Sequence, residues 1–153
     1  MKRACPPWPR CTCGGPAAPS GPPALACTFD VETRSEANRR DRHARMKRVE
    51  AARDATIAAI SVALAEGGAL PEHGPWFVRL TRLAPKIIDD DNLGGALKSV
   101  RDAVAATLGT DDGSPAFGKR VEQEKRSTFG VRVEIWGPSA RQVTLDDVLA
   151  RST

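Results

Sequence analysis

Apolar and polar residues alternate over residues 24–32, which predicts a first β-strand. Residues 36–65 contain neither glycine nor proline and are rich in alanine, arginine, lysine and glutamate, so we expect a long helix with Ser35 as its N-cap. The second half of this helix carries apolar residues at three- and four-residue steps, which predicts a face that packs on a sheet: Ile57, Ile60, Val62, Ala63 and Leu64.

The middle of the chain predicts a second strand and a second helix. Residues 76–83 alternate, with Arg79 and Arg82 near the polar edges of the strand. A helix is expected over residues 93–108, capped by Asp91 or Asn92, despite Gly94 and Gly95 in its first turn. Its apolar residues recur at helical steps: Leu93, Leu97, Val100, Val104 and Leu108.

The last third predicts two further strands. A turn-rich loop over residues 110–115 precedes a short strand at about 120–125 and a clearly alternating strand over 128–136. Trp76 and Trp136 fall in strands and are expected in the core or at a dimer interface. A short terminal helix capped by Thr144 is also expected.

The element order β-α-β-α-β-β favours a small α/β (α+β) fold, in which two main helices pack on one face of a small mixed β-sheet. A chain of 153 residues fits one domain. We expect this domain over residues 24–137, after a disordered leader rich in proline, glycine and cysteine over 1–23 and before a tail over 138–153. The cysteines do not match paired zinc spacings, and a zinc clip is a minor alternative for Cys5, Cys11, Cys13 and Cys27.

Positive charge is concentrated in one part of the chain. The formal net charge is +4, and the segment from Arg34 to Asp54 carries all of that excess. Clustered cations are typical of a surface that binds the phosphates of a nucleic acid. A solvated helix face with ion pairs is an equally good explanation of charge alone. The candidate DNA-binding residues are Asn38, Arg39, Arg40, Arg42, Arg45, Lys47 and Arg48.

Several classes of function are not indicated. No apolar run reaches the roughly 18 residues that span a bilayer, and the start of the chain has no apolar signal region, so we expect a cytoplasmic protein that does not bind membranes. The glycine-rich phosphate-binding motif that ends in Gly-Lys is missing, so no nucleotide cofactor is expected.

Three consecutive carboxylates, Asp89 to Asp91, stand directly before the second helix. In an extended segment Asp89 and Asp91 would project to one face, and such a pair suits a hard divalent cation. Asp111 and Asp112 follow the helix, and Lys98 lies about two helical turns after Asp91, where it can share the metal face or pair with Asp102. The structural alternative is a helix cap at Asp89 to Asn92 and an ordinary turn at Asp111 and Asp112.

These residues resemble a known series. Asp89-Asp90-Asp91-Asn92-Leu93, then Lys98 and Asp102, then Asp111-Asp112 is similar to the Asp-x-Asp-Asn-Leu, Lys-x-x-x-Asp and Asp-Asp motifs of the RusA family of Holliday junction resolvases. Ser35 to Arg40 resembles the segment that follows the family's first strand. About one extra helical turn separates Asn92 from Lys98.

The resemblance implies a RusA-like homodimer. The compactness of the chain suits a phage gene, so we expect the protein in a bacterial or phage-infected cell. The resemblance also implies a Mg²⁺-dependent DNA endonuclease, with Mn²⁺ as a possible substitute, that resolves four-way junctions in recombination and repair. By this resemblance Asp89, Asp91 and Asp112 hold the metal, with Asp111 as a fallback, and Lys98 helps to neutralise the scissile phosphate. A non-catalytic DNA-binding protein with the same fold is one alternative, since the extra turn shifts Lys98 by about 5 Å. A general metal-dependent nuclease for flaps or single strands is the other.

Overall fold

The computed structural model describes residues 19, 21–34, 41–138, 140–141 and 148–150. The described elements follow the predicted order, with one helix divided and one pair of very short strands added. They are β1 (Leu25–Phe29), α1 (Arg42–Ala65), β2 (Leu70–Pro71), β3 (Trp76–Ala84), α2 (Asp90–Ala96), α3 (Lys98–Thr107), β4 (Phe117–Lys125), β5 (Gly130–Trp136) and β6 (Ala140–Arg141).

The sheet is mixed, as predicted. Four strands lie in the order β1-β5-β3-β4, and β2 pairs with β6 in a separate two-stranded ladder. The strand β3 is central: it pairs antiparallel with β5, where Leu80 faces Val133, and parallel with β4, where Leu80 faces Val121. Parallel neighbours need a crossover connection, and α2 and α3 supply it.

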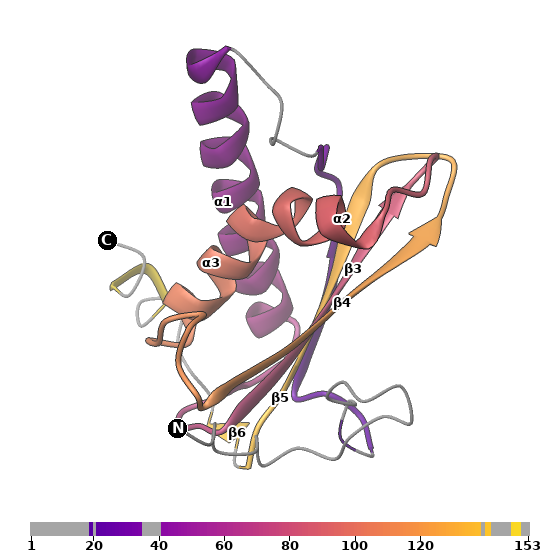
Figure 1. The fold of residues 1–153 in the computed structure, drawn as a ribbon. Coiled ribbons are helices and arrows are strands. Elements are labelled where there is room, and N and C mark those ends of the chain that lie inside the picture. Colours follow the sequence, from indigo (N-terminus) through magenta and orange to yellow (C-terminus); the bar gives the residue numbers. More distant parts are fainter. Residues whose placement is uncertain (1–18, 20, 35–40, 139, 142–147, 151–153) are drawn as a thin grey trace, which may run out of the picture.

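The helices cover one face of this sheet (Figure 1). Alternate residues of the strands enter the main apolar cluster together with residues of α1, α2 and α3, so the core lies between the sheet and the helices. From the strands this cluster takes Leu25, Trp76, Val78, Leu80, Phe117, Val131, Val133 and Ile135. The fold is therefore the expected mixed α+β arrangement.

The helix α1 begins at Arg42, because Asp41 has an extended backbone and its Oδ1 accepts a hydrogen bond from the Ala44 amide at 3.0 Å. The expected cap Ser35 lies outside the described residues. The apolar face is confirmed by the burial of Ile60 and Ala63, but Val62 is 56% exposed and does not belong to it. The buried stripe instead runs up the helix through Ala52 and Thr56.

The prediction of one continuous helix over 93–108 is wrong, because the structure has two helices there. The chain is helical from Asp90 to Thr107 except at Leu97, whose φ of −100° and ψ of 2° end α2 before α3 begins. Gly94 and Gly95 weaken the helix before this point, since glycine costs about 1 kcal/mol relative to alanine in a helix. Leu97 is fully buried, so the side chain at the break is anchored in the core.

The expectation of Arg82 at a polar edge is also wrong. Residues 79 and 82 lie on opposite faces of β3, because side chains alternate along a strand, and Arg82 is only 4% exposed. The strand β4 begins at Phe117, before the predicted start, and runs for nine residues. Trp76 and Trp136 are buried, as expected.

The two ends of the chain lie mostly outside the described residues, and with them the expected leader over 1–23, apart from 19 and 21–23. Residues 148–150 are helical and Val148 is fully buried, which agrees with a short terminal helix; its expected cap Thr144 is not described. Among the described helices, none combines the length and the apolar character needed to cross a membrane.

The glycines of α2 give a first test of this fold. A Cβ built on Gly95 meets nothing within 4 Å, so Gly95→Ala gains helix propensity without a clash and should stabilise the protein by about 1 kcal/mol. Gly68→Ala is the matched control, because its Cβ would come within 2.8 Å of the Ala63 carbonyl oxygen and should destabilise. Thermal unfolding of both variants measures the difference, and equal shifts would contradict the described geometry.

Candidate functional site

The three consecutive aspartates form the entry to α2. Asp89 is the N-cap: its Oδ1 accepts hydrogen bonds from the Asn92 backbone amide at 2.9 Å and from Asn92 Nδ2 at 2.8 Å. The expected caps, Asp91 and Asn92, are already inside the helix, so Asp89 and Asp91 do not form an extended pair. Asp89, Asp90 and Asp91 are all exposed, and negative charge in this position is favoured by the helix dipole.

Lys98 is the first residue of α3, and its ammonium group forms an ion pair on the same helix. Its Nζ lies 2.8 Å from Oδ2 of Asp102, one turn further along α3, and both side chains are about half exposed. The predicted pairing of Lys98 with Asp102 is thus confirmed. Since the helix α2 ends before Leu97, Lys98 belongs to a different helix from Asp91.

The second acidic pair lies in the turn between α3 and β4. Oδ1 of Asp111 accepts a hydrogen bond from the Gly113 amide at 2.9 Å, which is the turn that the structural alternative expected. Asp112 accepts from Arg101 Nε at 2.9 Å and lies 3.8 Å from Lys119 Nζ. Burial alone would raise the pKa of Asp112, but the charge of Lys119 and the hydrogen bond from Arg101 outweigh it and lower that pKa.

The structure does not bring the predicted metal ligands together. Asp89 precedes α2 and Asp112 follows α3, so they lie at opposite ends of this helix pair (Figure 1). Within the described part of the chain, no group of three or more histidine, cysteine, aspartate or glutamate side chains could hold a metal ion. The three-carboxylate site with Asp89, Asp91 and Asp112 stays a prediction from the sequence.

The middle of α1 approaches the last residues of α2. Arg42, Arg45 and Lys47 are exposed, whereas Arg48 is partly buried and lines a small pocket together with Arg34, Gly95 and Ala96. The helix α1 therefore meets α2 at Gly95 and Ala96, the end of α2 opposite to Asp89, and its main helix contact is with α3. Asn38, Arg39 and Arg40 lie outside the described residues.

Sequence reasoning missed a buried arginine next to the acidic segment. Arg82 Nε donates to Thr33 Oγ1 at 3.0 Å, Nη2 donates to the Thr33 carbonyl at 3.2 Å, and Nη1 donates to the Lys86 carbonyl at 2.8 Å. Its guanidinium also lies 5.7 Å from the ring centre of Phe129. Burial lowers the pKa of Arg82, since the charge is removed from water. The signal in the sequence was its spacing: an odd number of residues from Arg79 in one strand puts the two side chains on opposite faces.

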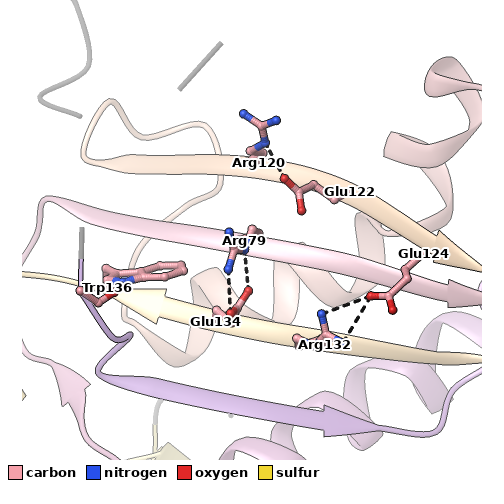
Figure 2. Close-up of polar contacts among 8 residues, drawn as sticks. Arg79, Arg120, Glu122, Glu124, Arg132, Glu134 and Trp136 are labelled. Carbon is pink, nitrogen blue, oxygen red and sulfur yellow. Dashed lines mark hydrogen bonds and ion pairs between the residues drawn. The ribbon is translucent and has the colours of Figure 1, made fainter. Parts of the chain in front are cut away.

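Sequence reasoning also missed the ion pairs on the sheet face without helices (Figure 2). Arg79 of β3 binds both carboxylate oxygens of Glu134 in β5, at 2.6 and 2.8 Å. The Arg79 guanidinium lies 5.2 Å from the ring centre of Trp136. The Arg79 guanidinium thus makes both charge-assisted hydrogen bonds and a cation–π contact, and these contacts link the two central strands, β3 and β5, on the sheet face without helices.

Cys27 was one of four cysteines considered for a zinc clip. It lies in β1 as a free cysteine, and burial raises the pKa of its thiol to about 11. A nucleophile must be a thiolate, so the thiol of Cys27 is a poor nucleophile near neutral pH. Cys5, Cys11 and Cys13 lie outside the described residues.

Comparisons with known proteins give no match to this chain, whether with family models, with curated proteins or with solved structures.

The ion pairs of Asp112 predict a pH-dependent stability. A carboxyl whose folded pKa lies below its unfolded value of about 3.9 stabilises the fold above that value, and this contribution is lost as pH falls through the folded pKa. Asp112→Asn should therefore cost about 1 kcal/mol of unfolding free energy at pH 7 and less at pH 3. Urea unfolding at both pH values measures this.

Asp111→Asn is the matched control, because an asparagine side chain preserves the turn contact to Gly113. Its effect should stay within about 0.5 kcal/mol at either pH. An Asp112→Asn penalty that is the same at pH 3 and pH 7 would show that the ion pairs do not stabilise the fold.

Proposed function

We propose that this chain is a Mg²⁺-dependent, structure-selective DNA endonuclease of the RusA type, which resolves four-way junctions as a homodimer. The observation that carries the proposal is a set of exposed carboxylates, Asp89 to Asp91, at the start of α2, together with exposed cations on α1, the helix that meets the other end of α2. A phosphodiester needs both, since cations hold its phosphates and carboxylates hold the metal that acts on it.

The carboxylates at α2 suit Mg²⁺ in number and kind. Mg²⁺ keeps several waters and is commonly bound by one or two carboxylates together with the phosphates of its substrate. Asp89 uses Oδ1 to cap α2, and Asp91 has no such role among the described hydrogen bonds. We assign the metal to Asp89 and Asp91; Asp112 lies at the other end of the helix pair, engaged with Arg101 and Lys119, and is not part of this site. The bound metal would supply an activated water and neutralise the developing charge on the phosphate.

The remaining residues have supporting roles in this proposal. Lys98 is half exposed near the end of α2 and is held by Asp102, so it can offer its charge to a phosphate of the bound strand. Arg42, Arg45 and Lys47 would grip the sugar-phosphate backbone without reading bases, which suits recognition of a branched shape. Mn²⁺ is expected to substitute for Mg²⁺, because both prefer oxygen ligands.

A second function is favoured by one observation. Asp112 is engaged with Arg101 and Lys119 at the far end of the helix pair, so the family's third carboxylate is missing from the acidic segment. A DNA-binding protein without cutting activity would have this arrangement. A general flap or single-strand nuclease would share the metal site and differ only in substrate.

Cleavage of a labelled four-way junction tests the proposal. The wild type should make paired symmetric nicks with Mg²⁺ and none with EDTA, and Asp91→Asn should lower the rate by about 100-fold or more while binding survives. Asp54→Asn, which changes an exposed carboxylate on α1, is the matched control and should cut like the wild type.

Each other outcome selects a different function. Binding without cutting by the wild type would favour the non-catalytic protein, and equal cleavage of flap, single-strand and junction substrates would favour the general nuclease. An Asp112→Asn variant that cuts as fast as the wild type would support a site made by Asp89 and Asp91 alone.

The basic half of α1 is tested separately through salt dependence. Arg45→Glu should weaken junction binding and reduce the slope of log affinity against log salt by about 1, because each lost phosphate contact removes that much counterion release. Arg126→Glu makes the same charge change in the turn between β4 and β5 and should leave the slope unchanged. Equal slopes for the wild type and Arg45→Glu would remove α1 from the DNA surface.

A further inference from the structure

The strand β4 forms one edge of the sheet and is as long as the central strand. It runs from Phe117 to Lys125, and all nine residues pair with β3 without interruption. No described strand pairs with its other edge. A long edge of this kind is a template for another strand, unless charges or irregularities block it.

The direction of the backbone groups along β4 follows from contacts at its two ends. The Ala116 carbonyl accepts from the Trp76 amide at 2.8 Å, and the Arg126 amide donates to the Ala84 carbonyl at 2.9 Å. Even-numbered residues of β4 therefore turn their amide and carbonyl groups toward β3, because these groups alternate in direction along a strand. The outward groups belong to the odd-numbered residues Phe117, Lys119, Val121, Gln123 and Lys125.

The charges of β4 decide how a second copy can pair with this edge. In a symmetric antiparallel pair of β4 strands, the twofold axis passes through a residue position. An axis midway between two residues would place the outward backbone groups of one copy opposite residues of the other copy whose backbone groups point inward. Axes at residues 119, 120 and 122 each set a charged residue against itself, and an axis at 123 sets Glu122 against Glu124. Like charges directly opposite one another destabilise a sheet.

The axis at Val121 avoids every like-charge pair. It opposes Arg120 to Glu122 of the other copy, twice by symmetry, and Lys119 to the neutral Gln123. Arg120 and Glu122 already lie on one face of β4, with Arg120 Nε 2.7 Å from Glu122 Oε1 (Figure 2). A second copy would extend this pair into a four-membered network of alternating charge.

We propose that two copies of this chain pair through β4, antiparallel and centred on Val121, so that the four strands of each copy join in one continuous sheet. The proposal deepens the homodimer of the proposed function and rests on that part of it, but not on the cleavage chemistry. Residues opposed in an antiparallel pair share a face, so the helices of both copies lie on the same side of the joined sheet. Both acidic segments and both basic helices would then face a single DNA junction.

Analytical ultracentrifugation of the full chain tests the pairing through a charge swap. Arg120→Glu sets a carboxylate at position 120 against the carboxylate of Glu122 in the other copy, and it should weaken dimerisation by at least about tenfold. The double variant Arg120→Glu with Glu122→Arg restores opposite charges and should restore the dimer. Arg53→Glu is the control, because Arg53 is exposed on α1, which packs against β1 at the opposite edge of the sheet, and it should leave the dimer intact.

Val121→Pro gives an independent test, since it removes an outward amide that makes no bond to β3. It should also yield monomers, with circular dichroism reporting whether the fold persists. A wild type that is monomeric overturns the proposal and the homodimer together. A dimer that resists Arg120→Glu overturns the β4 pairing alone, and cleavage of the junction, measured separately, reports on the chemistry.

Discussion

The parallel pairing of β3 with β4 is the constraint on which the rest of the structure depends. Two neighbouring parallel strands cannot be joined by a tight turn, so the chain must leave the end of β3, cross one face of the sheet and return. The helices α2 and α3 make that crossing, and Asp89 to Asp91 stand where it begins. The position of the acidic segment is thus a result of strand topology.

The two faces of the sheet are stabilised by different means. The helix-covered face buries aliphatic and aromatic side chains, and its contribution grows with the apolar area removed from water. On the other face Phe77 and Trp136 pack edge to face at 5.8 Å, and charged side chains lie over the strands. The pair of Arg79 with Glu134 is partly buried, so it is screened less by salt than a pair in open solvent.

The sequence predicted most of the strands and the long helix because these follow local periodicity, which shows clearly around Val133 and Ile60. It failed where a residue's surroundings come from elsewhere in the chain. The break at Leu97 depends on what its side chain meets in the core, and the burial of Arg82 depends on carbonyls of two loops. In the candidate site, the pairing of Asp112 with Lys119 joins a loop to a later strand, and no spacing rule reveals it.

The buried guanidinium of Arg82 makes two distant loops dependent on each other. It holds the carbonyl of Thr33 with one side of its fork and that of Lys86 with the other, and these loops precede α1 and α2. A lysine in its place could not span both, because its single ammonium lacks the planar fork. The backbone at Thr33 and the backbone at Lys86 are thereby tied to one side chain: a shift of either alone would leave a buried charge without one of its partners.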